Sequence, residues 1–206
     1  MATGPHVKPT AFRLEGQDLF AGAVMHSQEF KRPSDYAGKR VVVLGMGNTS
    51  ADIANALVGI ASEVYLSHSR GAHVLPRDLN GVPATSVLTH RLVRLQGTID
   101  WIFPRLRDFI SGRVLRKMTR MVFGELDPAW RLDDAPPATV TNPIINDELI
   151  PNLRAGSLRS VAGIQRITGP ETMELEDGST VAAEVIVCCV GYENNYDILA
   201  PQRQPH

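Results

Sequence analysis

The sequence predicts an α/β protein built around a parallel β-sheet with flanking helices. Three observations carry this prediction. Arg40–Leu44 is a short β-branched run between glycines, the stretch from Asp52 to Leu57 has helical spacing, and Glu63–Ser67 is a second strand-like run. A strand, a helix and a strand within roughly 28 residues form a βαβ unit, and the two strands of such a unit are parallel.

Composition and charge fit a globular protein and exclude several classes of function. The chain has 206 residues, of which 43% are hydrophobic and 21% charged, and its net charge is −1. Proteins that bind nucleic acid usually carry a strong positive charge, so we expect no nucleic-acid partner. The histidines lack metal-ligand spacing, so no metal site is predicted. Cys188 and Cys189 are neighbours in a predicted strand and point to opposite faces, which predicts small buried side chains rather than a disulfide.

The segments around the βαβ unit have weaker patterns. Residues 1–39 are rich in proline and glycine, which predicts loops, extended chain and short strands at most. Asn146-Asp147 is expected to cap a short helix. A hairpin is expected around the Asp177-Gly178 turn. The apolar run from Glu184 to Val190 predicts a further strand that ends at Gly191.

A basic helical stretch follows the βαβ unit. Apolar residues from Ser86 to Gly124 have helical spacing, with an interruption at Pro104. The same stretch collects basic residues, namely Arg91, Arg94, Arg105, Arg107, Arg113, Arg116, Lys117 and Arg120. Such a helix can lie on an anionic membrane, but a packed helix pair with a solvated basic face is favoured, so we expect no membrane contact. The chain shows neither a signal peptide nor a long apolar span, which predicts a cytoplasmic location.

A glycine turn between the first strand and the helix predicts a Rossmann-like nucleotide site. Gly45 permits the tight turn, and Gly47 lets a pyrophosphate approach the backbone. The phosphate then meets the free N–H groups at the helix N-terminus, where the helix dipole also favours an anion. Ser50 takes the place of the usual third glycine. The alternative is a glycine turn that binds no ligand.

The end of the second strand predicts NADPH rather than NADH. A site for NADH places a carboxylate here to bond the ribose 2′-hydroxyl, whereas a site for NADPH uses arginine. The strand ends without a carboxylate at its tip, because Glu63 lies at the opposite end. Ser69 can donate a hydrogen bond, and Arg70 can bind the 2′-phosphate through its planar guanidinium. The alternative is a surface arginine without a partner.

Four short stretches resemble the flavin-containing monooxygenases. Phe20-Ala-Gly22-Ala-Val-Met-His26-Ser-Gln-Glu-Phe30 is similar to the identifying motif of that family, F-x-G-x-x-x-H-x-x-x-aromatic, and lies a short distance before the glycine turn. The turn itself is similar to the NADPH motif of the family. Ala2-Thr3-Gly4 and Val190-Gly191-Tyr192 resemble its two A-T-G strand ends, although Cys189-Val190 replaces the Ala-Thr of the second.

The resemblance implies an arrangement of domains and a set of cofactor contacts. An NADPH-binding Rossmann-like domain, residues 36–138, would be inserted into parts of an FAD-binding domain, residues 1–35 and 139–206. The residues carried over to the pyrophosphate and ribose of NADPH are Gly45, Gly47, Asn48 and Thr49, with Ser50 in the same turn. Ser69 and Arg70 would meet the 2′-phosphate. Gly4 and Gly191 would approach the flavin. No catalytic residue is assigned.

The function implied by the resemblance is NADPH-dependent oxygenation of a soft nitrogen or sulfur in a small molecule. NADPH would reduce FAD, and the reduced flavin would trap O₂ as a hydroperoxide. The family has an earlier glycine-rich turn for FAD that this sequence lacks, so we expect an internal fragment that depends on a missing FAD-binding half. The alternatives are a non-catalytic NADP(H)-binding module and a fragment of a Baeyer–Villiger monooxygenase. The second alternative is disfavoured because Phe30-Lys31 replaces the Trp-Pro usual in those enzymes.

Overall fold

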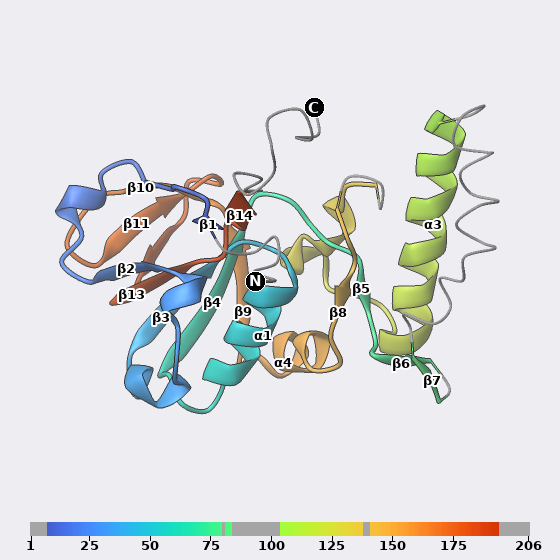
Figure 1. The fold of residues 1–206 in the computed structure, drawn as a ribbon, viewed down its shortest axis with the longest axis horizontal. Coiled ribbons are helices and arrows are strands. Elements are labelled where there is room, and N and C mark those ends of the chain that lie inside the picture. Colours follow the sequence, from blue (N-terminus) through green and yellow to red (C-terminus); the bar gives the residue numbers. More distant parts are fainter. Residues whose placement is uncertain (1–7, 80, 84–103, 138–140, 194–206) are drawn as a thin grey trace, which may run out of the picture.

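The centre of the protein is a parallel β-sheet of five strands (Figure 1). The computed structural model describes residues 8–79, 81–83, 104–137 and 141–193. In spatial order the strands are β2 (Ala23–His26), β13 (Val185–Cys188), β3 (Arg40–Leu44), β4 (Glu63–His68) and β9 (Arg159–Ala162). Each neighbouring pair is parallel, which confirms the predicted α/β class with a parallel sheet.

Helices cover one face of this sheet. Alternate side chains of β3, Val41 and Val43, pack with Leu57 of α1 (Asn48–Leu57) and with α4 (Leu149–Ala155) in one buried cluster. The side chain between them, Val42, points to the opposite face, as the two-residue period of a strand requires. Because both of its faces are covered, the run Val41–Val43 is fully buried.

A second sheet covers the opposite face. It consists of three antiparallel strands, β10 (Ile164–Ile167), β11 (Thr172–Leu175) and β12 (Thr180–Ala182). Met173 and Leu175 of β11 pack with Val42 and Ile186 in a separate buried cluster. The predicted Asp177-Gly178 hairpin is therefore real, and it forms a layer of the fold. Helices, parallel sheet and antiparallel sheet make three layers.

Strands far apart in the sequence alternate in the parallel sheet. β13 pairs with β2 on one side and with β3 on the other, so Val185 lies between Ala23 and Val41. The sheet thus contains strands from residues 1–35, 36–138 and 139–206. The division of the chain into these three domain segments stays a prediction.

The remaining elements flank the three layers, and some of them add buried side chains to the cluster on the helical face, namely Tyr36, Val74, Leu132 and Ile144. α3 (Pro104–Phe123) stands away from the central sheet (Figure 1) and is held to β5 (Val74–Leu75) by Thr119, whose hydroxyl donates to the Val74 carbonyl at 2.8 Å. The paired short strands are β1 (Lys8–Pro9) with β14 (Tyr192–Glu193), β5 (Val74–Leu75) with β8 (Ile144–Ile145), and β6 (Asp78–Leu79) with β7 (Val82–Pro83). The 3-10 helices are Gln17–Leu19, Ser27–Glu29, Pro33–Tyr36, Pro128–Trp130 and Leu132–Asp134.

The predicted basic helical stretch lies only partly within the described residues. Its second half, after Pro104, is the helix α3, whereas Arg91 and Arg94 fall outside the described ranges. Among the described residues, no helix combines the length and the apolar character needed to cross a membrane.

Candidate nucleotide-binding site

The glycine turn lies where the parallel sheet ends and α1 begins. Gly45 has a positive φ of 120°, a region that side-chain-bearing residues rarely adopt. A Cβ at this position would lie 2.6 Å from the carbonyl oxygen of Cys189. The turn therefore runs directly against the end of β13, and glycine is required there both for conformation and for space.

The second glycine leaves open space in front of the helix. Gly47 is the N-cap of α1 in an extended conformation, with φ −144°, and a Cβ there would meet nothing within 4 Å. The first N–H groups of the helix have no intrahelical acceptor and face this region. An anion here would meet both these donors and the positive end of the helix dipole.

Side chains of the turn hold its shape. The hydroxyl of buried Ser50 accepts the Gly47 N–H at 2.7 Å and donates to the Gly47 carbonyl at 2.8 Å. The side-chain oxygen of Asn48 accepts the Ile145 N–H of β8 at 2.8 Å. Thr49 is exposed. The side-chain oxygens of two predicted site residues, Asn48 and Ser50, are thus engaged in hydrogen bonds within the protein.

A network of hydrogen bonds centred on Asn146 holds α1 in place. Asn146 is buried, and its side-chain oxygen accepts the backbone N–H groups of Glu148 and Leu149 at 2.9 and 2.8 Å. The same oxygen accepts from the Asn55 amide at 2.8 Å, and the Asn146 amide donates to Asp52 at 3.1 Å. The predicted short helix is confirmed. Its N-cap is Glu148, whose side chain makes no capping bond; Asn146 accepts the N–H groups there instead and also ties α4 to α1.

The tip of β4 carries the second part of the site. Ser69 and Arg70 are exposed there, whereas His68 is buried beneath them. The His68 Nδ1 atom lies 2.9 Å from the Arg70 carbonyl, which can only accept, so Nδ1 carries the hydrogen. Burial lowers the pKa of His68, which favours the neutral ring. A neutral imidazole therefore orients the backbone of the tip without adding charge.

A single cavity joins the two parts. It has a volume of about 440 Å³, and both Gly45 of the turn and Arg70 of the tip line it. The other lining residues are Phe12, Leu44, Met46, His68, Ser69, Gly71, Pro136, Thr141, Ile164, Glu176 and Val190. The volume lies within the range of small-molecule sites, and the lining combines apolar side chains with a few polar groups. The structure thus brings Gly45 and Met46 of the turn together with Ser69 and Arg70. The other predicted turn residues, Gly47, Asn48, Thr49 and Ser50, do not line this cavity.

The tertiary structure adds a carboxylate to the tip of β4. Glu176, at the end of β11, accepts the Ser69 hydroxyl at 2.5 Å. A Cβ at Gly163 would lie 2.3 Å from the Ser69 oxygen and 2.7 Å from Glu176 Oε1, so this glycine makes room for the contact. The strand itself ends without a carboxylate, as the sequence indicated, but the hairpin supplies one beside it. Sequence reasoning missed Glu176 because it lies 107 residues further along the chain than Ser69, and no local pattern connects the two.

The residues expected near a flavin are only partly described. Gly191 has a φ of 87°, and its carbonyl accepts the Thr10 N–H at 3.2 Å and lies 3.1 Å from His26 Nε2. His26 belongs to the stretch that resembles the identifying motif of the flavin-containing monooxygenases, and here it connects β2 to the chain after β13. Gly4 lies outside the described residues.

The two cysteines are free thiols, as expected. Burial raises the pKa of Cys188 to about 11 and, together with its neighbour, the pKa of Cys189 to about 12. Both therefore remain protonated at neutral pH and are poor nucleophiles.

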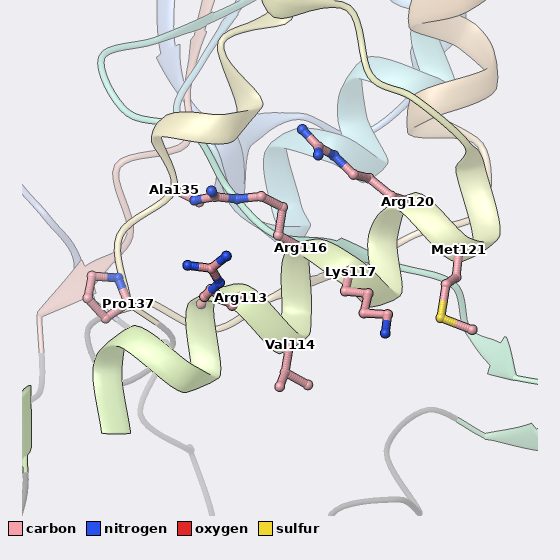
Figure 2. Close-up of a pocket in the computed structure, with 9 residues that line it drawn as sticks. Arg113, Val114, Arg116, Lys117, Arg120, Met121, Ala135 and Pro137 are labelled. Atoms are coloured by element: carbon pink, nitrogen blue, oxygen red, sulfur yellow. The ribbon is translucent and has the colours of Figure 1, made fainter. Parts of the chain in front are cut away.

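A larger cavity of about 780 Å³ lies along α3. Figure 2 shows Arg113, Arg116 and Arg120 on one side of the helix, whereas Lys117 and Met121 point the other way. Arg116 and Arg120 both pair with Asp133, at 3.6 and 3.4 Å, so their charge is partly balanced within the protein. This cavity contains no part of the glycine turn.

Comparison with known proteins identifies the family of this chain. The family model "Flavin-binding monooxygenase-like" matches residues 1–202. "Monooxygenase aurF" of Gibberella zeae is 38% identical over 99% of this chain, which covers 38% of that protein. "Indole-3-pyruvate monooxygenase YUCCA6" of Arabidopsis thaliana is 28% identical over 94% of this chain and 46% of its own length. The chain thus spans less than half the length of these relatives.

Solved structures show the same fold. A polycyclic ketone monooxygenase from Thermothelomyces thermophila matches with a TM-score of 0.70 at 16% identity, over 94% of this chain and 41% of its own. A cyclohexanone monooxygenase from Rhodococcus sp. Phi1, bound to NADP⁺, matches with a TM-score of 0.65 at 18% identity, over 92% of this chain and 45% of its own. Since the family model covers nearly the entire sequence, this chain belongs to the flavin-binding monooxygenase-like family.

Proposed function

We propose that this chain binds NADPH in the cavity between the glycine turn and the tip of β4, as the nucleotide-binding part of a flavin-dependent monooxygenase. The observation that carries the proposal is that Gly45 and Met46 of the turn line the same cavity as Ser69 and Arg70 of the tip, with the start of α1 directly after the turn. A pyrophosphate at the start of α1 and a 2′-phosphate at Arg70 are the two anionic groups of one adenosine unit. The apolar part of the lining then faces the adenine.

The residues of the chain have distinct roles in this proposal. Gly47 provides the open approach to the helix, and the free N–H groups of Asn48 and Thr49 bind the pyrophosphate. The Arg70 guanidinium binds the 2′-phosphate, and His68 holds the backbone that carries it. Bound NADPH supplies a hydride; these residues bind and orient the nucleotide.

The proposal that the whole protein uses a flavin rests on its family membership. Of the two glycines expected near the flavin, the structure describes Gly191, whose carbonyl is already engaged by Thr10. A Cβ at Gly191 would meet nothing within 4 Å, so the approach of a flavin to this glycine stays part of the proposal. For the whole protein we propose oxygenation of a soft nitrogen or sulfur in a small molecule, with O₂ as the second substrate.

Calorimetric titration of the full chain with NADPH, with and without FAD, tests the proposal. We expect saturable one-site binding of NADPH. Oxygenation of an amine or sulfide by the chain with added FAD would extend the proposal to catalysis, whereas NADPH binding without flavin uptake would favour the non-catalytic module. Oxygenation of a ketone instead would favour the Baeyer–Villiger alternative. Absence of NADPH binding in both titrations would contradict the proposed site.

A further inference from the structure

The carboxylate of Glu176 lies beside Ser69 and lines the same end of the cavity as Arg70. Its backbone N–H donates to the Gly163 carbonyl at 2.8 Å, which anchors the end of β11 beside the tip of β4. Its side chain lines the same cavity as Arg70 and accepts the Ser69 hydroxyl. The place of Glu176 therefore rests on a backbone contact as well as a side-chain contact.

The contact with Glu176 changes what Ser69 can offer to a ligand. A hydroxyl has one hydrogen, and Ser69 donates it to Glu176, so it has none left for a phosphate oxygen. An ionised carboxylate only accepts hydrogen bonds. A 2′-phosphate would meet repulsion from this carboxylate, whereas the 2′-hydroxyl of NADH could donate to it.

One end of the cavity therefore carries a group that favours the 2′-phosphate of NADPH and a group that favours the 2′-hydroxyl of NADH. The ionisable side chains among the described lining residues are His68, Arg70 and Glu176. His68 is favoured in its neutral form, which leaves one cation and one carboxylate to act on the ligand. Arg131 adds positive charge nearby, since it acts on both His68 and Asp177.

We propose that Glu176 is a specificity-determining residue, which weakens the preference for NADPH and lets the site accept NADH as well. Arg70 attracts the 2′-phosphate, and Glu176 opposes it while accepting a hydrogen bond from an unphosphorylated ribose. This inference rests on the proposed nucleotide site and concerns the discrimination between its two possible ligands.

The test measures dissociation constants of NADPH and NADH for the full chain and for Glu176→Gln. Gln keeps an oxygen that accepts from Ser69 but removes the charge. We expect the ratio of NADH to NADPH dissociation constants to rise by about tenfold, mainly through tighter NADPH binding. Glu174→Gln is the matched control, because Glu174 pairs with Arg166 in the same hairpin and does not line the cavity. We expect that control to leave the ratio unchanged.

The unmodified chain provides an independent measurement. Titration with 2′,5′-ADP and with 5′-AMP isolates the effect of the 2′-phosphate, and we expect a preference of less than about 100-fold. A much stronger preference, or an unchanged ratio in Glu176→Gln, would overturn the role of Glu176 while leaving the nucleotide site in place. If neither nucleotide bound the unmodified chain, the proposed function would fail along with the inference.

Discussion

The two ends of the nucleotide cavity are built in different ways. At the glycine turn, Gly45 and Met46 line the cavity, and the shape of the turn is set by residues close in sequence, from Gly45 to Ser50. At the tip of β4, side chains form the surface, and they come from separate segments: Ser69 and Arg70 after β4, and Glu176 beyond β11.

This difference predicts different responses to mutation. Backbone geometry can be changed only by strain or by added atoms, so changes at the turn affect folding, binding or both. Side chains at the tip are exposed and can be exchanged with little effect on the fold. We therefore expect the turn to control whether a nucleotide binds and the tip to control which nucleotide binds.

The largest effect is expected for Gly45→Ala. The new Cβ would meet the Cys189 carbonyl in a backbone conformation unfavourable to alanine, which we expect to lower the free energy of unfolding by about 4 kcal/mol. Gly47→Ala is the matched control, because its Cβ meets no atom within 4 Å. Urea unfolding should show near-normal stability for Gly47→Ala, while calorimetry should show weaker NADPH binding. Equal stability of the two variants would show that the backbone at Gly45 is not constrained as the comparison of the two ends assumes.

Asn146→Ala should have the next largest effect. It removes an acceptor shared by two backbone N–H groups and Asn55, and we expect a loss of about 2 kcal/mol in the free energy of unfolding. Asp147→Asn keeps the oxygen that accepts the Arg77 N–H at 2.9 Å and should cost much less. Chemical denaturation of both variants checks this. If Asn146→Ala left stability intact, the network would have no part in holding α1.

Arg70→Ala should affect only the choice of nucleotide. Loss of a charge-assisted contact with the 2′-phosphate should weaken NADPH by about 2 kcal/mol, with NADH nearly unchanged and thermal stability preserved. Dissociation constants for both nucleotides provide the measurement. An equal loss for NADPH and NADH would show that Arg70 does not contact the 2′-phosphate.

The smallest effect concerns pH. Because the pKa of buried His68 is lowered in the folded protein, the unfolded chain takes up this proton first as the pH falls below the ordinary value of about 6.5. The contribution of His68 to stability is therefore present above that pH and is lost as the pH falls toward the folded pKa. Urea midpoints should decline between about pH 7.5 and 5.5, and they should decline less in His68→Gln. An identical decline in both proteins would assign the effect to other groups, such as His73, whose pKa burial also lowers.

How far the sequence predicted the fold depends on the distance between interacting residues. The boundaries of β3 were predicted correctly, and those of β4 differ only by the inclusion of His68, because their apolar runs are local signals. α1 begins at Asn48, earlier than its apolar spacing suggested, since polar residues form its first turn. The membership of β2 in the sheet was not predicted, because its partner β13 lies about 160 residues away in the chain.

In the candidate site, too, local features were predicted from the sequence and long-range contacts were not. Glycine spacing after a buried strand was enough to predict the anion-binding turn, since Gly45 and Gly47 act through the conformation of neighbouring backbone. The carboxylate of Glu176 beside Ser69 depended on tertiary structure, because hairpin packing over the parallel sheet brings together residues with no local relation. The sequence alone thus determined where an anion could meet a helix, and the packing of three layers decided which charges face the far end of that ligand.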